Sequence, residues 1–390
     1  MQTSRQRIPS QTQAVVIGAG FGGLSTALSL ARRGIRVVVY ERMGYPGGCA
    51  STFERGGYQF EAGATLFSGF GENQLFKQWQ EDLDLPVDLS WLDPVVELRS
   101  AGLTLPISRN RQQFVDDLCK LPGAPADKLT EFFAFQKEVA DLFWTLLAQP
   151  SLLPPFSTRT VLKHIPLLIG GRRLIPWIGK PLSAIIDSFG LSHFTPLRII
   201  LDAVSQITVQ AQSHEAEALI ALATADYFFR GTCHVNGGIS QLAHAVAERI
   251  ESHGGRVCYK TGVKQIEKSG SGWLVHTTRG STQCSTVVAN LLPQAAARLS
   301  NDLTLQAKLE PLSKRVREGW GAAMLYRAIR DSAELPEHPH HVQLIANPEL
   351  PFSEGNHLFA SISGRHEIGR SPPGSRVITV STHIPITTYR

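Results

Sequence analysis

The chain has 390 residues, a length that can bury two sizeable hydrophobic cores. Hydrophobic residues make up 43% of it and charged residues 18%, which is the composition of a folded protein. The net charge of +5 is modest and the Lys and Arg residues form no aromatic-studded basic block, so we expect no nucleic-acid partner. No run of about 18 apolar residues occurs, so no membrane-spanning helix is expected.

The cysteines and the first residues predict a cytoplasmic protein. The five cysteines are dispersed without a CxxC pair, which is typical of reduced thiols rather than of a disulfide framework. The first thirteen residues are polar and lack the apolar core of a signal peptide.

The first predicted elements form a β-α-β unit. A short β-branched run at Ala14–Ile17 predicts a buried strand, and the apolar spacing that follows predicts a helix ending at Gly34. Residues 35–40 predict a second strand, which ends at the acidic Glu41. The glycines between the first strand and the helix have GxGxxG spacing, so we expect a dinucleotide-binding unit rather than a plain glycine-rich turn.

Each part of this unit has a physical role. Gly18 permits a tight turn, Gly20 lets the backbone approach a pyrophosphate, and Gly23 lets the helix pack closely on the strand. The helix N-terminus offers N–H groups to phosphates, and Glu41 would accept hydrogen bonds from a ribose hydroxyl. The candidate nucleotide-binding residues here are Gly18, Ala19, Gly20, Phe21, Gly22, Gly23 and Glu41. The unit alone does not distinguish NAD from FAD.

The next stretch carries a family resemblance. Residues 42–71 read RMGYPGGCASTFERGGYQFEAGATLFSGFG, with a Gly-Gly pair shortly after the acidic strand end and then GYQFEAGA. This pattern resembles the FAD-binding opening of the carotenoid desaturase/isomerase family, which is related to the flavin amine oxidases. The resemblance implies FAD contacts from Arg42, Gly47 and Gly48. Cys49 stands where phytoene desaturases commonly have Arg, and we expect it to be a small buried loop residue.

A second part of the resemblance lies at residues 234–267. A Gly-Gly turn opens a predicted helix that ends at Gly254, and residues 256–260 predict a strand. In the family, the residue that matches Val263 pairs its backbone with the adenine of FAD. Residues 273–278 predict a hairpin strand, and residues 285–290 predict a return to the nucleotide sheet. A nucleotide domain that opens at residue 14 and resumes near residue 235 favours FAD over NAD.

The sequence between these two parts is rich in Phe and Leu and predicts helices at 130–148, 198–210 and 215–229. The helical stripe of the first contains Phe132, Phe135, Val139, Leu142, Phe143 and Leu146. By the family resemblance such an insertion would line a tunnel for a long apolar substrate. An ordinary helical core is the alternative.

Residues 142–186 contain no Asp or Glu, but they contain apolar residues, Trp177 and several cations. This composition suits contact with an anionic membrane surface, with Trp at headgroup depth. The alternative is a flexible basic lid over the pocket. The cations of this stretch are Arg159, Lys163, Arg172, Arg173 and Lys180.

After Pro293, four runs of alternating or β-branched residues predict an antiparallel sheet under the substrate site. The motif EHPHH at residues 337–341 invites a metal interpretation. It lies between prolines and has no second ligand cluster, so we expect surface histidines in a loop and no metal site.

The expected fold is α/β: a split FAD-binding Rossmann-type domain, glutathione-reductase-like, with an inserted substrate domain. Residues 1–72 and 234–293 are assigned to the FAD-binding domain. Residues 73–233 are assigned to a helical part of the substrate domain, and residues 294–390 to its antiparallel-sheet part. The sequence identifies no catalytic acid or base.

The resemblance implies an FAD-dependent oxidoreductase that acts on a long apolar polyene, most simply a carotenoid desaturase that transfers a hydride to flavin. The alternatives are a non-redox carotenoid cis–trans isomerase, a flavin amine oxidase and an inactive truncated flavoprotein. The possibility of an inactive truncated flavoprotein arises because the family's C-terminal glycine-rich segment, which contacts the flavin, is not found in the sequence. The expected location is cytoplasmic and peripherally membrane-associated.

Overall fold

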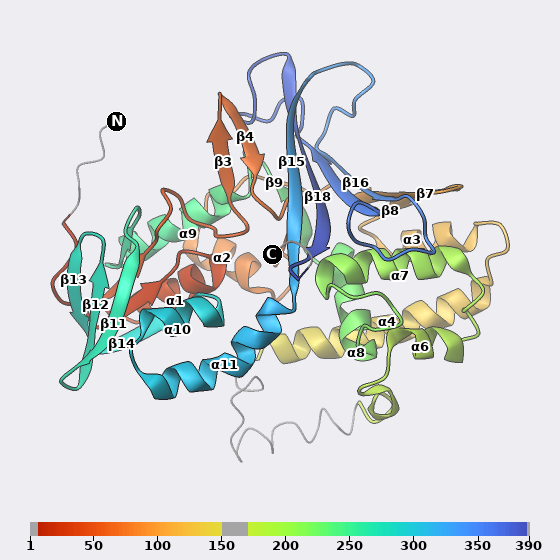
Figure 1. The fold of residues 1–390 in the computed structure, drawn as a ribbon. Coiled ribbons are helices and arrows are strands. Elements are labelled where there is room, and N and C mark those ends of the chain that lie inside the picture. Colours follow the sequence, from red (N-terminus) through yellow and green to blue (C-terminus); the bar gives the residue numbers. More distant parts are fainter. Residues whose placement is uncertain (1–6, 150–170, 388–390) are drawn as a thin grey trace.

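The structure is a computed structural model that describes residues 7–149 and 171–387. Its elements form three parts, which Figure 1 shows as a nucleotide-type sheet with its helices on the left, a group of helices on the right, and a long twisted sheet that rises between them. Within the described ranges, no helix has both the length and the apolarity needed to cross a bilayer.

The left part is built on a four-stranded parallel sheet in the order β10-β2-β1-β14. These strands are β1 (Ala14–Ile17), β2 (Val37–Tyr40), β10 (Arg256–Cys258) and β14 (Thr286–Ala289). β1 and β2 are buried along their whole length because helices α1 (Phe21–Ala31) and α9 (Ser240–Ser252) cover one face and a second sheet covers the other. Two distant segments thus form one sheet, as the split Rossmann-type fold predicts.

An antiparallel meander covers the other face of the parallel sheet (Figure 1). It consists of β11 (Val263–Ser269), β12 (Gly272–Thr277) and β13 (Gly280–Cys284). The hydroxyl of Tyr40 lies 2.5 Å from that of Thr282 on β13, which ties the two sheets together inside the core. The expected hairpin at residues 273–278 is confirmed by β12.

The right part is helical, and the three expected helices are present. Helix α4 buries Phe132 and Val139 of the expected stripe, whereas Phe135, Leu142 and Phe143 are only half-buried. The N-terminal half of α4 therefore belongs to an ordinary helical core, and its C-terminal half is free for another role. The elements of this part are α3 (Arg111–Cys119), α4 (Ala126–Leu147), η2 (Ile175–Trp177), α6 (Leu182–Ser188), α7 (Thr195–Thr208), α8 (Ala218–Thr224) and η3 (Ala225–Phe228).

The sheet between the two parts has six strands in the order β15-β18-β17-β16-β7-β8. The four late strands are antiparallel, as expected, but β16 pairs with β7 in parallel, so the whole sheet is mixed. β7 and β8 come from a region that the sequence analysis assigned to the helical part. The strands are β7 (Val96–Ser100), β8 (Leu103–Ile107), β15 (Trp320–Arg330), β16 (His340–Ile345), β17 (His357–Ile362) and β18 (Ser375–Pro385).

Two further helices, α10 (Pro293–Leu299) and α11 (Leu303–Arg317), precede the late strands and were not expected from the sequence. Short elements join the three parts. They are β3 (Thr52–Arg55), β4 (Tyr58–Glu61), β5 (Phe67–Ser68), α2 (Leu75–Leu83), β6 (Leu89–Ser90) and β9 (Thr232–Val235). The expected domain boundaries stay a prediction.

Candidate functional site

The glycine loop after β1 is pressed against the end of β14. Gly18 has a φ of +95°, and a Cβ atom there would lie 2.7 Å from the carbonyl oxygen of Asn290. A Cβ atom on Gly23 would collide with the carbonyl oxygen of Gly18. Gly18 and Gly23 therefore have the turn and close-packing roles that their spacing predicts.

The N-terminus of α1 follows this loop directly. Gly20 is its N-cap, no side chain caps the helix, and its first turn contains no acidic residue. Phe21 and Gly22 lie in that first turn, so their N–H groups point out of the helix end. The partial positive charge of this end suits a phosphate.

Glu41 lies beside the same loop and already holds it in shape. Its Oε2 atom accepts a hydrogen bond of 2.8 Å from the Ala19 N–H, and its Oε1 atom accepts one of 2.7 Å from the Met43 N–H. A carboxylate has about four acceptor positions, so two remain for ribose hydroxyls. Arg42 is exposed next to it.

The Gly-Gly pair packs on the first glycine loop. The Gly47 N–H donates a hydrogen bond of 2.8 Å to the Ala19 carbonyl, and a Cβ atom on Gly48 would lie 3.2 Å from the Gly20 Cα. The expectation for Cys49 is wrong, because its side chain is exposed rather than buried. The turn at Gly47 and Gly48 leaves the next side chain at the surface.

Val263 begins β11, which follows a connection tied to the acidic end of β2. The Thr261 N–H donates to the Glu41 carbonyl at 2.7 Å, and the Lys260 N–H donates to the Met43 carbonyl at 2.9 Å. The candidate nucleotide-binding residues from both segments thus meet at the carboxyl edge of the parallel sheet, where nucleotides bind in such folds. Their contact with a nucleotide stays a prediction.

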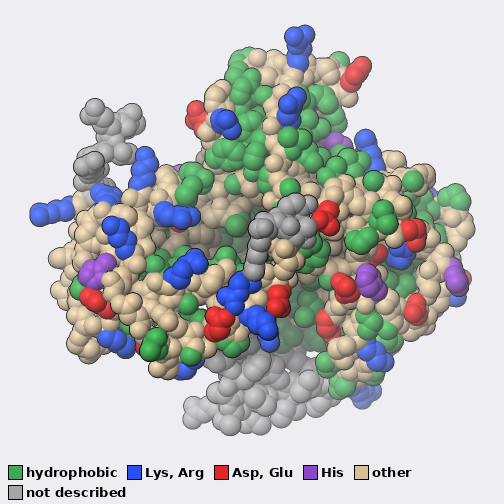
Figure 2. Space-filling model, in the orientation of Figure 1, with side chains coloured by type: hydrophobic (Ala, Val, Ile, Leu, Met, Phe, Trp, Pro, Cys, Tyr) green, Lys and Arg blue, Asp and Glu red, His purple; other side chains and the backbone are tan. Residues whose placement is uncertain are grey.

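A cavity of about 510 Å³ lies between the helical part and the six-stranded sheet. Figure 2 shows this face of the molecule hollowed near its centre, below the upper lobe that contains β3, β4 and part of β15. The walls come from four places: the segment after β4, the C-terminal half of α4, the ends of α7 and α8, and the strands β15, β17 and β18. Its larger apolar side chains are Leu66, Phe143, Trp144, Ile207, Met324 and Phe359.

The lining of the cavity, as far as the structure describes it, is uncharged at ordinary pH. Among the described residues that line it, none is Asp, Glu, Lys or Arg. Burial raises the pKa of the Tyr227 hydroxyl and lowers the pKa of His383, so both side chains are uncharged near neutrality. Such a space suits a long uncharged molecule.

The wall of the cavity also contacts the second glycine loop. A Cβ atom on Gly63, a wall residue, would lie 2.6 Å from the carbonyl oxygen of Cys49, and the Ala64 N–H donates to the same carbonyl at 3.4 Å. The cavity and the candidate nucleotide site therefore share a wall segment, residues 63–68. This adjacency is what a cofactor-dependent reaction requires.

The expectation for the EHPHH motif is wrong for its last histidine. His341 lies in β16 and is 1% exposed, and its Nδ1 atom lies 2.7 Å from the Ser361 hydroxyl. The burial follows from pairing of β16 with both β7 and β17, which the local sequence does not reveal. The described ranges contain no group of three or more metal-ligand residues.

Two features of the site have no clear signal in the sequence: Asn290, whose side chain lies against the glycine loop, and a buried ionic cluster. In that cluster Arg370 donates a hydrogen bond of 2.9 Å to Glu61 and lies 3.5 Å from Glu367. The only signal for Asn290 was its place at the end of a strand in the nucleotide sheet. Glu61 lies 309 positions from Arg370 and gave no local signal.

The stretch without Asp or Glu, residues 142–186, is described only in part, and Arg159 and Lys163 lie outside the described residues. Arg172, Arg173 and Lys180 are exposed. Beside them Ile175 and Ile178 are 51% and 64% exposed. The Lys180 ammonium lies 5.1 Å from the ring centre of Trp177, so apolar and cationic groups share one surface.

Known proteins with similar sequences are named for reactions of retinol, phytoene and prolycopene. The all-trans-retinol 13,14-reductase of Danio rerio is 25% identical over 67% of this chain and 43% of its own length. The neurosporene-forming phytoene desaturase of Cereibacter sphaeroides is 26% identical over 65% of this chain and 47% of its own length. Prolycopene isomerase 1 of an Oncidium hybrid cultivar is 25% identical over 65% of this chain and 43% of its own length. The chain thus spans less than half the length of these relatives.

Solved structures share the fold at lower identity. An oxidoreductase from Methanosarcina mazei superposes with a TM-score of 0.62 at 19% identity, over 95% of this chain and 79% of that one. A fatty acid isomerase from P. acnes superposes with a TM-score of 0.59 at 13% identity, over 96% of this chain and 78% of that one.

The family assignment agrees with the resemblance given by the glycine motifs and with a flavin as the cofactor. The family described as "Flavin containing amine oxidoreductase" matches residues 21–323, which is well over half of the sequence. The chain therefore belongs to the flavin-containing amine oxidoreductase family, within which its named relatives include carotenoid desaturases and isomerases.

Proposed function

We propose that the protein is an FAD-dependent oxidoreductase that desaturates a long apolar polyene of the carotenoid type. The observation that carries this proposal is the uncharged cavity whose wall segment, residues 63–68, also contacts the Gly47–Gly48 loop. The names of the relatives support a polyene as the substrate class.

The glycine cradle fits FAD. Gly18, Gly20 and Gly48 leave room where Cβ atoms would crowd the loop, and the uncapped N-terminus of α1 would hold the pyrophosphate. Glu41 would hold the ribose, and the backbone at Val263 the adenine. A bound flavin supplies an acceptor for a hydride.

The cavity residues act by placement and by excluding water. Phe143, Trp144 and Phe359 would pack along an extended polyene, and Tyr227, whose hydroxyl donates to the Leu66 carbonyl at 3.4 Å, helps to fix the shared wall. The absence of charge from the described lining favours a hydrocarbon over an amine, which would be bound as a cation and would need an anionic partner.

The test is incubation of the flavin-loaded protein with carotenoid substrates, followed by mass spectrometry and chromatography of the products. Loss of two hydrogens supports desaturation. An unchanged mass with a shifted retention time would instead identify a cis–trans isomerase, the second candidate that the relatives favour. Flavin reduction by amines but not by polyenes would overturn the proposal.

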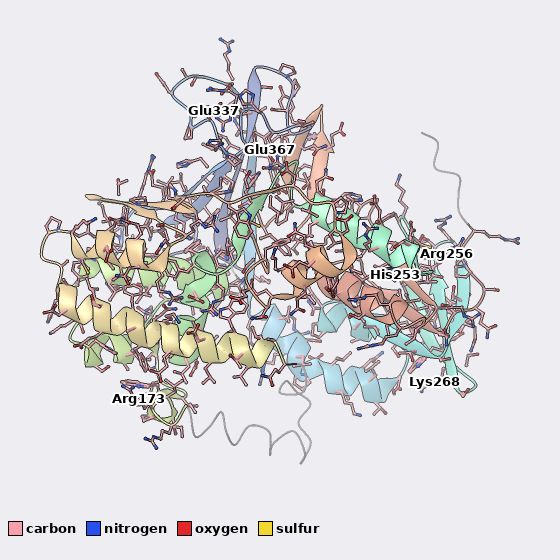
Figure 3. All side chains as sticks on the ribbon, turned by 180° about the vertical axis from the view of Figure 1, so that it is seen from behind. Arg173, His253, Arg256, Lys268, Glu337 and Glu367 are labelled. Atoms are coloured by element: carbon pink, nitrogen blue, oxygen red, sulfur yellow. The ribbon has the colours of Figure 1, made fainter. Side chains whose placement is uncertain are left out.

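We further propose that the segment 172–180, most of whose residues are exposed, contacts an anionic membrane surface, from which a polyene would be collected. Two exposed isoleucines among cations, with Trp177 beside Lys180, are the features of an interfacial segment. Figure 3 shows Arg173 projecting from the lower end of the molecule.

Replacing Ile178 by Asp is expected to weaken binding to vesicles that contain anionic phospholipid by at least about tenfold. The change removes the transfer free energy of an inserted isoleucine, about 2 kcal/mol, and adds a charge of the same sign as the lipid. Ile368, which is 91% exposed elsewhere, is the matched control, and Ile368→Asp should bind normally. Co-sedimentation measures both variants, and equal binding of Ile178→Asp and the unmodified protein would contradict the assignment.

A further inference from the structure

A second cleft lies elsewhere on the molecule, and none of its described lining residues also lines the cavity. It has a volume of about 460 Å³ and is lined by Asp88, Gly237, Glu367 and Ile368, among others. Because the Ile368 side chain is 91% exposed, the cleft reaches the surface. A line of buried polar side chains leads from this cleft toward the polyene cavity.

The end of the line nearest the cavity consists of two hydroxyls and one imidazole. Thr65 lines the cavity, and its Oγ1 atom lies 2.7 Å from the Ser361 Oγ. The same Oγ lies 2.7 Å from the Nδ1 atom of His341. Thr65 and Ser361 are each 8% exposed and His341 is 1% exposed, so bulk water does not interrupt these contacts.

The end nearest the cleft consists of His234 and Glu367. The Nε2 atom of His234 lies 3.0 Å from Glu367 Oε1, which also accepts a hydrogen bond of 2.9 Å from the Gly237 N–H. The side chains of His234 and Glu367 are 3% and 2% exposed. Glu367 thus ends the buried line at the wall of the cleft.

The two ends meet at a pair of imidazoles. The ring centres of His234 and His341 are 5.4 Å apart. Within the described part of the chain, His234 Nδ1 and His341 Nε2 are buried and have no protein hydrogen-bond partner. Buried polar atoms of this kind are usually bridged by water, and a water molecule between the two rings would give both nitrogens a partner.

We propose that Thr65, Ser361, His341, His234 and Glu367 form a proton relay between the polyene cavity and the solvent cleft. The inference deepens the proposed function and rests on it. It also supplies the acid–base group that the sequence did not reveal.

Desaturation of a C–C bond requires such a route because the two hydrogens leave in different forms. One would leave with the bonding electron pair as a hydride, for which a bound flavin would be the acceptor, and the positive charge left on the polyene would make the neighbouring C–H bond acidic. That hydrogen leaves as a proton to the Thr65 hydroxyl, and its electron pair forms the C=C bond. Each group then passes on its own proton, and Glu367 releases one to water in the cleft.

The electrostatics of the line suit transfer rather than storage. Burial holds the pKa of His341 well below its usual range, and the positive charge of the nearby Arg370 acts in the same direction, so the ring is neutral between transfers. A neutral imidazole accepts a proton at one nitrogen and releases another from the second.

The Glu367 carboxylate is ionised at neutral pH and can therefore accept the proton. Burial alone would raise the pKa of Glu367, but its hydrogen bond to His234 and the charges of His234 and Arg370 hold that pKa below the usual range. Arg370 also pairs with Glu61 at 2.9 Å, which places a second carboxylate on the same cation.

The position of the cleft fits this role. Figure 3 shows Glu367 and Glu337, which both line the cleft, in the upper part of the molecule, while Arg173 projects from the lower end. The proton is therefore released far from the surface through which a polyene is proposed to enter.

The first test compares His341→Phe with His357→Phe. His357 is also 1% exposed and in the same sheet, but it stacks on Phe352 and lies outside the relay. His341→Phe is expected to lower kcat by at least about tenfold, in the range of acid–base contributions, with the half-saturating polyene concentration unchanged. His357→Phe should retain the full kcat. Equal kcat in His341→Phe and the unmodified protein would overturn the relay.

The second test does not depend on turnover and uses nitrogen NMR of the histidine rings in the purified full chain. His341 is expected to be neutral at pH 7, and His234→Phe should shift its ring-nitrogen signals, whereas His357→Phe should not. The relay would be overturned if His341 is protonated at pH 7, or if His234→Phe leaves the ring-nitrogen signals of His341 unchanged. Ser361→Ala breaks the line with a smaller change, so a kcat loss in this variant supports the relay even where His341→Phe fails to fold.

The two tests separate the relay from the proposed function. Coupled histidine signals in a protein that converts no polyene would reject the proposed function but retain the connected line. Polyene conversion that is insensitive to both His341→Phe and Ser361→Ala would retain the function and reject the relay.

Discussion

Replacing Gly23 by Ala is expected to lower the free energy of unfolding by about 3 kcal/mol and to abolish flavin binding, because the new methyl group has no room. The Cβ atom would collide with the Gly18 carbonyl oxygen and would lie 3.2 Å from the Cβ and Nδ2 atoms of Asn290. The backbone oxygen cannot move aside without opening the glycine loop. In an unconstrained helix the same substitution would stabilise by about 1 kcal/mol, so the sign of the effect is diagnostic.

Gly34→Ala is the matched control for Gly23→Ala. Gly34 has a φ of +75° but no atom within 4 Å of its Cβ position, so the cost is conformational only, about 1 kcal/mol. Denaturant unfolding gives the stability of each variant, and titration with FAD followed by absorbance gives its flavin affinity. A Gly23→Ala variant that is more stable than the parent would contradict the close approach of α1 to the glycine loop.

The part of the site that the sequence predicted is the part whose signals are local. Turn, helix start and strand period all lie within residues 14–41, and each is set by neighbours a few positions away. The same holds for α4 and for the late strands. The helix α11 was missed because it contains Pro311, and Ser313 is its one buried residue.

The missed features depend on contacts between distant segments. His341 looked like a surface residue because prolines precede it, yet pairing of β16 with β7 and β17 places it in the core. The pairing of β16 with β7 joins residues some 245 positions apart, as Val342 and Glu97 do, and no local pattern encodes such a partner.

The ionic cluster of Glu61, Glu367 and Arg370 gives the second large expected effect. Replacing Arg370 by Met is expected to lower the free energy of unfolding by about 4 kcal/mol, because it leaves two buried carboxylates without their shared cation. The Arg370 side chain is 4% exposed and both carboxylate side chains are 2% exposed. Lys77→Met is the control, since Lys77 and Glu81 form an exposed pair at 3.1 Å that is worth less than about 1 kcal/mol.

The loss of unfolding free energy in Arg370→Met is expected to become smaller as the pH is lowered. Burial raises the pKa of Glu61 even against the opposing charge of Arg370, and removal of that charge raises it further. A carboxyl whose folded-state pKa is raised destabilises the fold above that pKa, and protonation relieves this cost, so the variant should recover part of the difference between about pH 8 and about pH 5. In the unmodified protein Glu367 acts in the opposite sense, because its lowered pKa gives stability that is lost in acid.

Denaturant unfolding at a series of pH values measures this difference between Arg370→Met and the unmodified protein. The double variant Glu61→Gln/Arg370→Met removes one of the two stranded charges and is expected to regain part of the lost stability at neutral pH. A loss in Arg370→Met that is independent of pH, or a double variant no more stable than the single one, would mean that Arg370 stabilises the fold by packing rather than by its charge.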